Sequence, residues 1–249
     1  MKKKVLFVIC LILIIVAGIC IIYREQTIAV LGYHDFTSTK SENEMQIEID
    51  KFEKEMKYLK RHHYHTITLK EMECFINKTC TLPRKSILIT MDDGYSSNYD
   101  LAFSILKKYQ FNAVVFYIGT NYNENNSIYM NKAIIEKAQK EYPNIEFASH
   151  TYDLHHEEDY LLDYDSINND FQKQKEVIKT KYFAYPYGHV SKNIEKALQN
   201  NNYKLAFTFG PDKEHRKAKQ TDDKYHIPRL NISANMPYWK YVIRLLMPF

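Results

Sequence analysis

The stretch Ser86-Ile-Leu-Ile-Thr-Met-Asp-Asp-Gly-Tyr95 is an apolar run that stops at two neighbouring carboxylates. A short apolar run with a polar boundary is typical of a strand that is buried on both faces, as in a parallel sheet. The glycine after the two acids permits a tight turn. The stretch therefore predicts a central strand with Asp92 and Asp93 at its carboxyl end.

The same arrangement recurs along the chain. Apolar runs at 27–33, 145–148 and 182–184 also predict strands, and His34, His150 and Tyr187 follow them. Predicted helices alternate with the strands, so we expect an α/β fold with a mostly parallel sheet. Seven or eight such units in about 220 residues indicate a barrel, and barrel enzymes build their sites at the carboxyl ends of the strands. We therefore expect these side chains to meet.

Residues 1–23 stand apart from the rest of the chain. Lys2, Lys3 and Lys4 precede Val5–Ile22, eighteen residues without a charge. A run of this length can span a bilayer, and the lysines predict that the N-terminus stays in the cytoplasm. We expect one transmembrane helix as an anchor, with a single catalytic domain, residues 24–249, outside the cell membrane. The alternative is a cleaved signal segment, which would leave a secreted protein.

Composition narrows the class of protein further. The formal net charge of +4 falls to +1 when the three N-terminal lysines are set aside. An ectodomain so close to neutral lacks the broad basic field that recruits nucleic acid. Cys74 and Cys80 either pair, as extracellular cysteines do, or remain separate thiols. The apolar stretch Tyr238–Phe249 either packs against the barrel or touches the membrane.

One Asp and two His make a three-ligand metal set. Asp93, His150 and His155 would leave an open coordination position on a zinc-like ion, although Co, Ni and Fe(II) accept the same ligands. Such an ion lowers the pKa of bound water. Asp92 would take the proton of that water, and His34 could protonate a leaving amine. The sequence thus predicts hydrolytic metal chemistry.

Three motifs resemble those of the polysaccharide deacetylases of carbohydrate esterase family 4. They are Thr90-Met-Asp-Asp-Gly94, His150-Thr151 with His155, and the Pro186-Tyr187 turn, and the resemblance covers roughly residues 27–235. It implies a distorted (β/α) barrel with about seven parallel strands and metal-dependent removal of acetyl groups from N-acetylglucosamine polymers. Carried over, Asp92 is the base, Asp93, His150 and His155 bind the metal, and Tyr187 helps to form the oxyanion hole.

Three departures from the usual family pattern point to one branch. The histidines are five residues apart instead of four, Ala184 stands where an Arg is usual, and the late Leu-x-His is missing. These features resemble the branch that deacetylates poly-β-1,6-N-acetylglucosamine of biofilm. That branch takes its acid from an early Tyr-His, which matches Tyr33-His34. His226 is the fallback acid, and Arg229 is a candidate to orient Asp92.

We therefore expect an extracellular enzyme that releases acetate from poly-β-1,6-N-acetylglucosamine. The alternatives are a peptidoglycan or chitin-type deacetylase, a catalytically silent carbohydrate-binding barrel, and a membrane-tethered structural protein. Tyr95, Tyr152, Pro186 and Arg229 are the expected substrate-binding residues. Trp239 is a further candidate to stack on a sugar, with simple packing as its alternative.

Overall fold

Six consecutive parallel strands form most of a barrel wall. The computed structural model describes residues 26–124, 127–209 and 216–247. The strands are β1 (Thr27–Tyr33), β5 (Ser86–Met91), β6 (Ala113–Tyr117), β7 (Ile145–Ser149), β8 (Tyr182–Ala184) and β9 (Leu205–Thr208). Each one pairs in parallel with the next, in this order. The carboxyl ends of all six therefore meet at one end of the wall.

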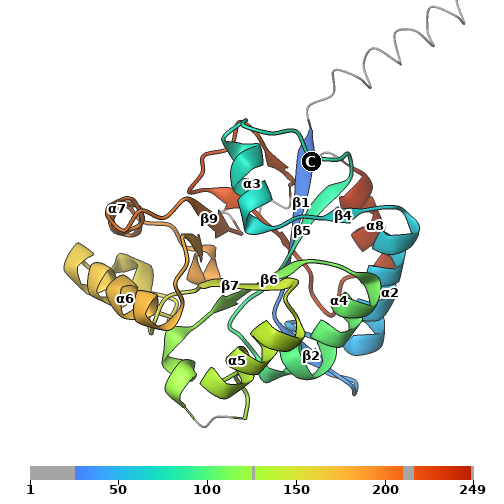
Figure 1. Ribbon diagram of the computed structural model, residues 1–249, viewed down its shortest axis with the longest axis horizontal. Coiled ribbons are helices and arrows are strands. Elements are labelled where there is room, and N and C mark those ends of the chain that lie inside the picture. Colours follow the sequence, from blue (N-terminus) through green and yellow to red (C-terminus); the bar gives the residue numbers. More distant parts are fainter. Residues whose placement is uncertain (1–25, 125–126, 210–215, 248–249) are drawn as a thin grey trace, which may run out of the picture.

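The segment that follows β9 closes the ring. Its first part, β11 (Ile227–Pro228), pairs with β9, and its second part, β12 (Leu230–Asn231), pairs with β1. Arg229 lies between the two pairings. The sequence of 226–230 indicates a single strand, but the strand is interrupted here because the segment leaves β9 and joins β1. The closed order of strands confirms the prediction of a barrel with about seven parallel strands (Figure 1).

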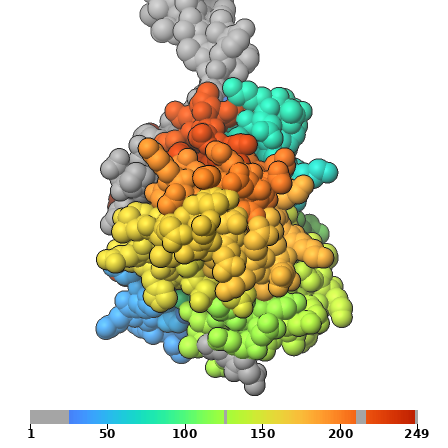
Figure 2. Space-filling view, turned by 90° about the vertical axis from the view of Figure 1, so that its left-hand side faces the viewer, coloured from blue at the N-terminus to red at the C-terminus, as the bar shows by residue number. Residues whose placement is uncertain are grey.

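Helices cover the outside of the wall. They are α2 (Ile49–Arg61), α3 (Leu69–Ile76), α4 (Phe103–Tyr109), α5 (Lys132–Glu141), α6 (Tyr164–Val177), α7 (Lys192–Asn200) and α8 (Tyr238–Leu246). Short helical turns are η1 (Asn98–Ala102), η2 (Gly119–Asn123), η3 (Asp159–Leu161) and η4 (Pro186–Gly188). Figure 2 shows the side on which the yellow and orange residues of α6 and α7 cover the middle of the molecule.

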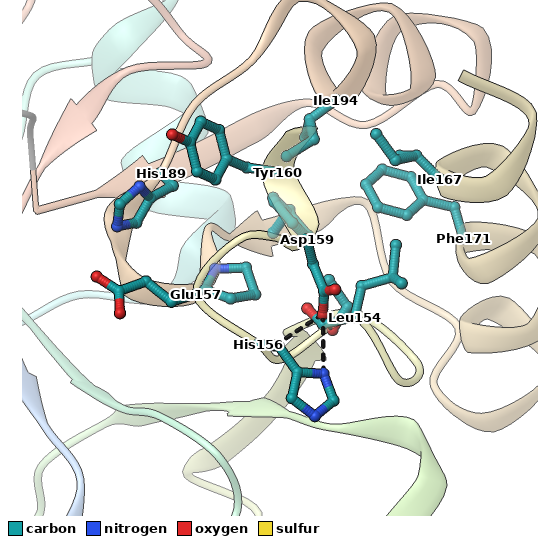
Figure 3. A pocket seen from close by; sticks show the side chains of 12 residues that line it. Leu154, His156, Glu157, Asp159, Tyr160, Ile167, Phe171, His189 and Ile194 are labelled. Atoms are coloured by element: carbon teal, nitrogen blue, oxygen red, sulfur yellow. Dashed lines mark hydrogen bonds and ion pairs between the residues drawn. The ribbon is translucent and has the colours of Figure 1, made fainter. Parts of the chain in front are cut away.

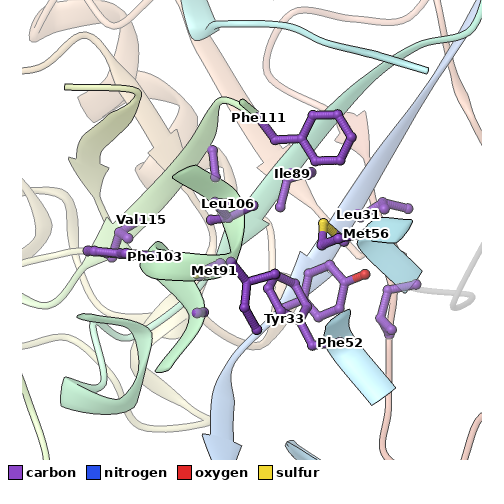
Figure 4. Close-up of a cluster of buried hydrophobic side chains, with 14 of the residues drawn as sticks. Leu31, Tyr33, Phe52, Met56, Ile89, Met91, Phe103, Leu106, Phe111 and Val115 are labelled. Carbon is purple, nitrogen blue, oxygen red and sulfur yellow. The ribbon is translucent and has the colours of Figure 1, made fainter. Parts of the chain in front are cut away.

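Alternate residues of the strands face two different cores, because successive side chains of a strand point to opposite faces. Val30, Leu88, Phe116 and Phe207 belong to one buried cluster, together with Met72 and other residues of α3. The alternate positions of β1, β5 and β6 belong to a second cluster, in which they pack against α2, α4 and α8. Figure 4 shows part of this second cluster, with residues of β1, β5 and β6 against residues of α2 and α4.

The first residues of α3 show how local sequence fixes an element. Thr68 accepts a hydrogen bond from the backbone N–H of Glu71, and the Glu71 side chain accepts one from the backbone N–H of Thr68. This reciprocal arrangement satisfies two N–H groups at the helix start. Leu69 N–H also donates to the Glu146 carboxylate of β7 at 2.9 Å, so α3 is held at the amino end of the barrel.

Several parts of the chain differ from expectation. The polar stretch 120–127 begins with the helical turn η2 rather than with plain loop. The charged stretch 215–224 contains the strand β10 (Ala218–Lys219), which pairs antiparallel with the start of β1. Two short strands, β2 (Asp35–Thr37) and β3 (Gln46–Glu48), form a separate pair, and β4 (His65–Thr66) joins β5.

Cys74 and Cys80 are joined by a disulfide, which resolves the two alternatives for this pair. The anchor expected over residues 1–23 lies outside the described residues. Within residues 26–124, 127–209 and 216–247, every helix is too short or too polar to cross a bilayer.

Candidate active site

Three side chains gather at the carboxyl ends of β5 and β7. Nε2 of His155 lies 3.1 Å and Nε2 of His150 lies 3.4 Å from Oδ1 of Asp93. One ligand atom of each residue lies within 4.8 Å of the others. Asp93 follows β5 directly, His150 follows β7 directly, and His155 lies on the loop after β7. The structure thus brings together the three residues expected to bind the metal.

The donor set fits a small divalent ion. Ligand atoms about 2.0–2.1 Å from a tetrahedral metal lie about 3.3–3.4 Å from one another, close to the separations seen here. Oδ1 of Asp93 is buried and has no hydrogen-bond partner among the described residues. A buried oxygen without a partner is costly, and a bound cation would remove that cost. Together these features make a possible metal site of one carboxylate and two imidazoles.

The ring of His150 is oriented for this role. Its Nδ1 lies 2.8 Å from the carbonyl oxygen of Ala184. A carbonyl only accepts, so Nδ1 carries the proton and Nε2 keeps its lone pair toward Asp93. Burial alone would lower the pKa of His150, but Asp92 and Asp93 outweigh burial and raise that pKa. The site therefore attracts positive charge.

Asp170 of α6 holds the loop that carries His155. Its carboxylate accepts the backbone N–H groups of Tyr152 at 2.8 Å, Asp153 at 2.8 Å and Leu154 at 3.3 Å. Thr151, just before them, has a φ of +70°, a strained value for a β-branched residue. Sequence reasoning missed Asp170, because nothing in a mid-helix aspartate indicates which distant loop it will contact.

Arg229 binds the second carboxylate, Asp92. Its Nη1 and Nη2 donate to Oδ1 and Oδ2 of Asp92 at 2.6 and 2.8 Å. The guanidinium lies 4.1 Å from the ring centre of Phe209 and 5.4 Å from that of Phe116. Burial would raise the pKa of Asp92, but Arg229 and the neighbouring histidines outweigh burial and lower it. Asp92 is therefore an ionised carboxylate.

Arg229 is fully buried. This burial removes it from any surface that a polysaccharide touches, which corrects its expected place among the substrate-binding residues.

His34, directly after β1, faces Asp92 from the other side. Its Nε2 lies 3.8 Å from Oδ2 of Asp92, and its ring stacks on Phe209 with ring centres 6.1 Å apart. Burial lowers the pKa of His34, although Asp92 and Asp93 oppose that effect. A lowered pKa makes the protonated ring a stronger acid. His34 is therefore placed to receive a proton that Asp92 has taken.

The fallback acid, His226, lies elsewhere. It directly precedes the short strand β11, and its side chain is partly exposed. Its Nε2 is 2.9 Å from Oε1 of Glu195 on α7. His226 therefore contacts an outer helix and not Asp92, which corrects its expected role as a substitute acid.

The Pro186-Tyr187 turn lies beside the candidate metal-binding side chains. Tyr187 has a φ of +56°, and its hydroxyl donates to the backbone oxygen of His155 at 3.2 Å. The ring centres of Tyr187 and His155 are 5.1 Å apart. Tyr187 is 53% exposed, so its ring forms a wall of the site that solvent and ligands can reach.

A small apolar cavity lies behind this turn. Leu154, Tyr160, Ile167 and Phe171 line it together with Pro186, at a volume of about 20 Å³ (Figure 3). This is about the space of one water molecule. The cavity is too small for a sugar ring, so Pro186 faces apolar packing on this side.

The aromatic candidates for sugar binding have different surroundings. Tyr95 packs against Tyr129 with ring centres 4.9 Å apart, and the two residues form an isolated β-bridge. Tyr152 instead packs near Gly119 and under Lys173 of α6. Trp239 lies on the exposed side of α8, a helix that packs against Tyr58 of α2. Tyr129 was not among the sequence candidates, because its role depends on pairing with a distant segment.

The comparison with known proteins agrees with this geometry. The family model described as polysaccharide deacetylase matches residues 79–206, just over half of the chain. The chain belongs to the polysaccharide deacetylase family, and it is an N-deacetylase hydrolase. The expectation of an enzyme rather than a silent binding barrel or a structural protein is confirmed. The matched segment contains Asp92 and the three metal-site residues but leaves out His34 and Arg229.

Individual relatives cover most of the chain. It is 28% identical over 239 residues to the Staphylococcus epidermidis protein named poly-beta-1,6-N-acetyl-D-glucosamine N-deacetylase, spanning 85% of this chain and 81% of that one. Two solved structures share the fold. The Streptococcus pyogenes deacetylase PplD in complex with acetate has a TM-score of 0.79 at 20% identity, over 90% of this chain and 100% of that one. IcaB from Ammonifex degensii has a TM-score of 0.73 at 24% identity, over 89% and 96%.

Proposed function

We propose that this enzyme removes acetyl groups from poly-β-1,6-N-acetylglucosamine outside the cell and depends on a divalent metal. The observation that carries the proposal is the pairing of His34 with Asp92 at 3.8 Å, beside the Asp93, His150 and His155 set. An acid supplied by the first strand is the feature that distinguishes this substrate branch. The Staphylococcus epidermidis relative of that name supports the same substrate.

Each residue has a defined task in the proposed reaction. Asp93, His150 and His155 would hold the ion, most simply zinc, with Co, Ni and Fe as alternatives. Bound there, the ion would supply a polarised water and a Lewis acid for the acetyl carbonyl. Asp92, kept ionised by Arg229, accepts a proton from the attacking water.

The remaining residues complete the transfer. His34 donates a proton to the amine that leaves, because a neutral amine is a far better leaving group than an amide anion. The backbone at Tyr187 contributes to the oxyanion hole, and the Tyr187 ring borders the acetyl-bearing sugar. Tyr95 and its partner Tyr129 form a second aromatic surface near Asp93 on which a sugar ring could stack.

We also propose that the barrel lies outside the cell, anchored by residues 1–23. The run of eighteen uncharged residues after three lysines supports this placement. The Cys74–Cys80 disulfide supports it as well, because disulfides persist in oxidising compartments. If the proposal is right, protein in the membrane fraction retains Met1, and protease added outside the cell cleaves the barrel. Secreted protein that begins near Tyr23 would contradict an anchor.

The substrate is tested by acetate release from defined β-1,6 and β-1,4 N-acetylglucosamine oligomers of equal length. We expect clear preference for the β-1,6 series. Preference for the β-1,4 series would favour the alternative of a peptidoglycan or chitin-type deacetylase. Active protein that holds no metal ion would contradict the metal-dependent mechanism.

A further inference from the structure

One outer surface of the molecule carries apolar side chains that the described residues leave exposed. Helix α8 buries Tyr241 and Leu245 against the barrel. Its other side presents Trp239, Ile243 and Leu246, which are 63%, 43% and 57% exposed, and Met247 follows at 40%. Their spacing places them along one face of the helix. We call these four residues the α8 stripe. An exposed apolar stripe of this kind usually marks a contact surface.

The α8 stripe runs toward the place where the chain enters the barrel. The backbone oxygen of Leu245 accepts hydrogen bonds from Nζ of Lys217 at 2.6 Å and from the hydroxyl of Tyr64 at 3.4 Å. Lys217 directly precedes β10, which pairs with Thr27 and Ile28 at the start of β1. In Figure 1 the red helix α8 lies beside β1 on the side of α2. The end of α8 therefore lies near the first described residues.

The length of the chain ahead of β1 limits how far this region can lie from a membrane. Only Tyr23, Arg24 and Glu25 separate the uncharged run Val5–Ile22 from Gln26. Three extended residues reach about 10 Å. If the uncharged run spans a bilayer, the start of β1 lies within about that distance of the lipid headgroups, and the end of α8 is its neighbour.

Cations surround the α8 stripe. Lys240 is exposed on α8 itself. Nζ of Lys54 lies 4.2 Å from the ring centre of Tyr238, and Nζ of Lys85 lies 5.7 Å from that of Tyr64. An amphipathic helix with an apolar face and flanking lysines is typical of segments that lie in the interface of an anionic membrane.

We propose that the α8 stripe lies in the headgroup region of an anionic phospholipid bilayer and holds the barrel on its side against the membrane. Helix α8 runs back along β1, from the end of β12 to the start of β1. In this orientation the strands follow the bilayer surface, and the active site at their carboxyl ends opens sideways. The proposal rests on the proposed membrane location but not on the proposed substrate.

Trp239 is the only tryptophan of the chain, so the native protein carries its own probe. The full chain is inserted into vesicles of phosphatidylcholine with one quarter phosphatidylglycerol, either plain or with brominated acyl chains. We expect Trp239 emission to fall about twofold or more in the brominated vesicles, since an interfacial indole meets the acyl chains. We expect weaker quenching when phosphatidylglycerol is left out.

The double variant Ile243→Glu with Leu246→Glu tests the helix face. Both side chains are exposed, so the fold should persist, and acetate release should be unchanged. Quenching should disappear while the chain still floats with the vesicles. Leu161→Glu, a similarly exposed leucine on η3, is the matched control and should leave quenching unchanged.

Three outcomes would overturn the proposal. If the chain floats with brominated vesicles but Trp239 emission is not quenched, α8 faces water. Quenching that survives the double variant would assign the contact to another surface. Emission that depends on protein concentration and not on lipid would indicate that a second copy covers the α8 stripe. If the native chain is quenched but releases no acetate from β-1,6 oligomers, that result would instead contradict only the proposed substrate.

Discussion

Arg229 binds both carboxylate oxygens of Asp92, at 2.6 and 2.8 Å, from inside the barrel. Both side chains are almost completely buried, so each charge depends on the other. A buried ion pair contributes little net stability over an apolar pair, but removal of one partner leaves an unpaired charge. The pair therefore fixes the position of the proposed base more than it stabilises the fold.

The first prediction follows from this pair. Arg229→Met should lower the free energy of unfolding by about 3–5 kcal/mol, because it leaves the Asp92 charge buried and unpaired. Asp92→Asn combined with Arg229→Met should recover part of that loss, since both charges of the pair are then removed together. Urea denaturation measures both, and neither variant should release acetate. Equal instability of the single and double variants would show that Arg229 acts mainly through packing.

The second prediction concerns the metal. Asp93→Ala or His155→Ala should each remove the bound ion, and chelation of the native enzyme should abolish acetate release until Zn or Co is added. His156→Ala is the matched control, because His156 is an exposed neighbour that contacts Asp159 instead. Metal analysis of the purified proteins measures the effect. A metal content of His155→Ala equal to that of His156→Ala would remove His155 from the ligand set.

The third prediction concerns the acid. His34→Ala should lower turnover by about 10²–10⁴-fold, the usual contribution of general acid–base catalysis. Its metal content should be unchanged, because His34 is not part of the ligand set. His226→Ala, which breaks only the contact with Glu195, should be mild. A nearly normal His34→Ala enzyme would take away the main reason for the β-1,6 substrate.

The fourth prediction concerns Asp170. Asp170→Asn keeps one acceptor oxygen but turns the other into an NH₂ group that faces backbone N–H donors. We expect metal affinity to fall about 10–100-fold, as for other residues that orient ligands. Asp165→Asn, an exposed change on the same helix, should have no effect. Titration with Zn measures the affinity, and similar values for the two variants would show that the loop does not need Asp170.

The fifth prediction concerns pH and a buried carboxyl beneath His34. Oε2 of Glu55 accepts a hydrogen bond from Tyr33 at 2.9 Å, and burial raises the pKa of Glu55 from 4.5 to about 7. The folded state therefore binds the proton more tightly than the unfolded state. The contribution of protonated Glu55 to the free energy of unfolding is complete below pH 4.5 and is lost as the pH rises toward 7. The loss amounts to about 3 kcal/mol.

Urea denaturation at pH 5 and pH 8 tests this sign. Glu55→Gln should unfold with a free energy that changes less between the two pH values than that of the native enzyme. The variant should therefore gain stability relative to the native enzyme as the pH rises. The prediction would be wrong if the native enzyme gained stability relative to Glu55→Gln between pH 5 and pH 8.

The sequence predicted the strands and the meeting of the candidate metal ligands for one physical reason. An apolar run with a polar end, such as Ser86–Asp93, encodes both a buried strand and the residue that emerges from it. Parallel strands then bring Asp93 and His150 together without further information. The bounds of β1 and β8 match the apolar runs 27–33 and 182–184 for the same reason.

The rest of the site depends on contacts between distant segments. Asp170 binds a loop that precedes its own helix, Tyr129 pairs with Tyr95 across a connection, and neither pattern is visible locally. Arg229 interrupts what reads as one strand, and its burial follows from the closure of the ring. His226 was misplaced because the sequence does not show that its side chain turns outward to Glu195 on α7 instead of toward Asp92.

The closure of the ring by residues 227–231 also has a consequence for the order of events during synthesis. A nascent chain that ends before this segment already carries Asp93, His150 and His155, yet it lacks the cation that holds Asp92 and the strand that joins β9 to β1. The environment of the proposed base is complete only when nearly the whole chain has emerged. We therefore expect a chain that lacks residues 227–231 to be inactive.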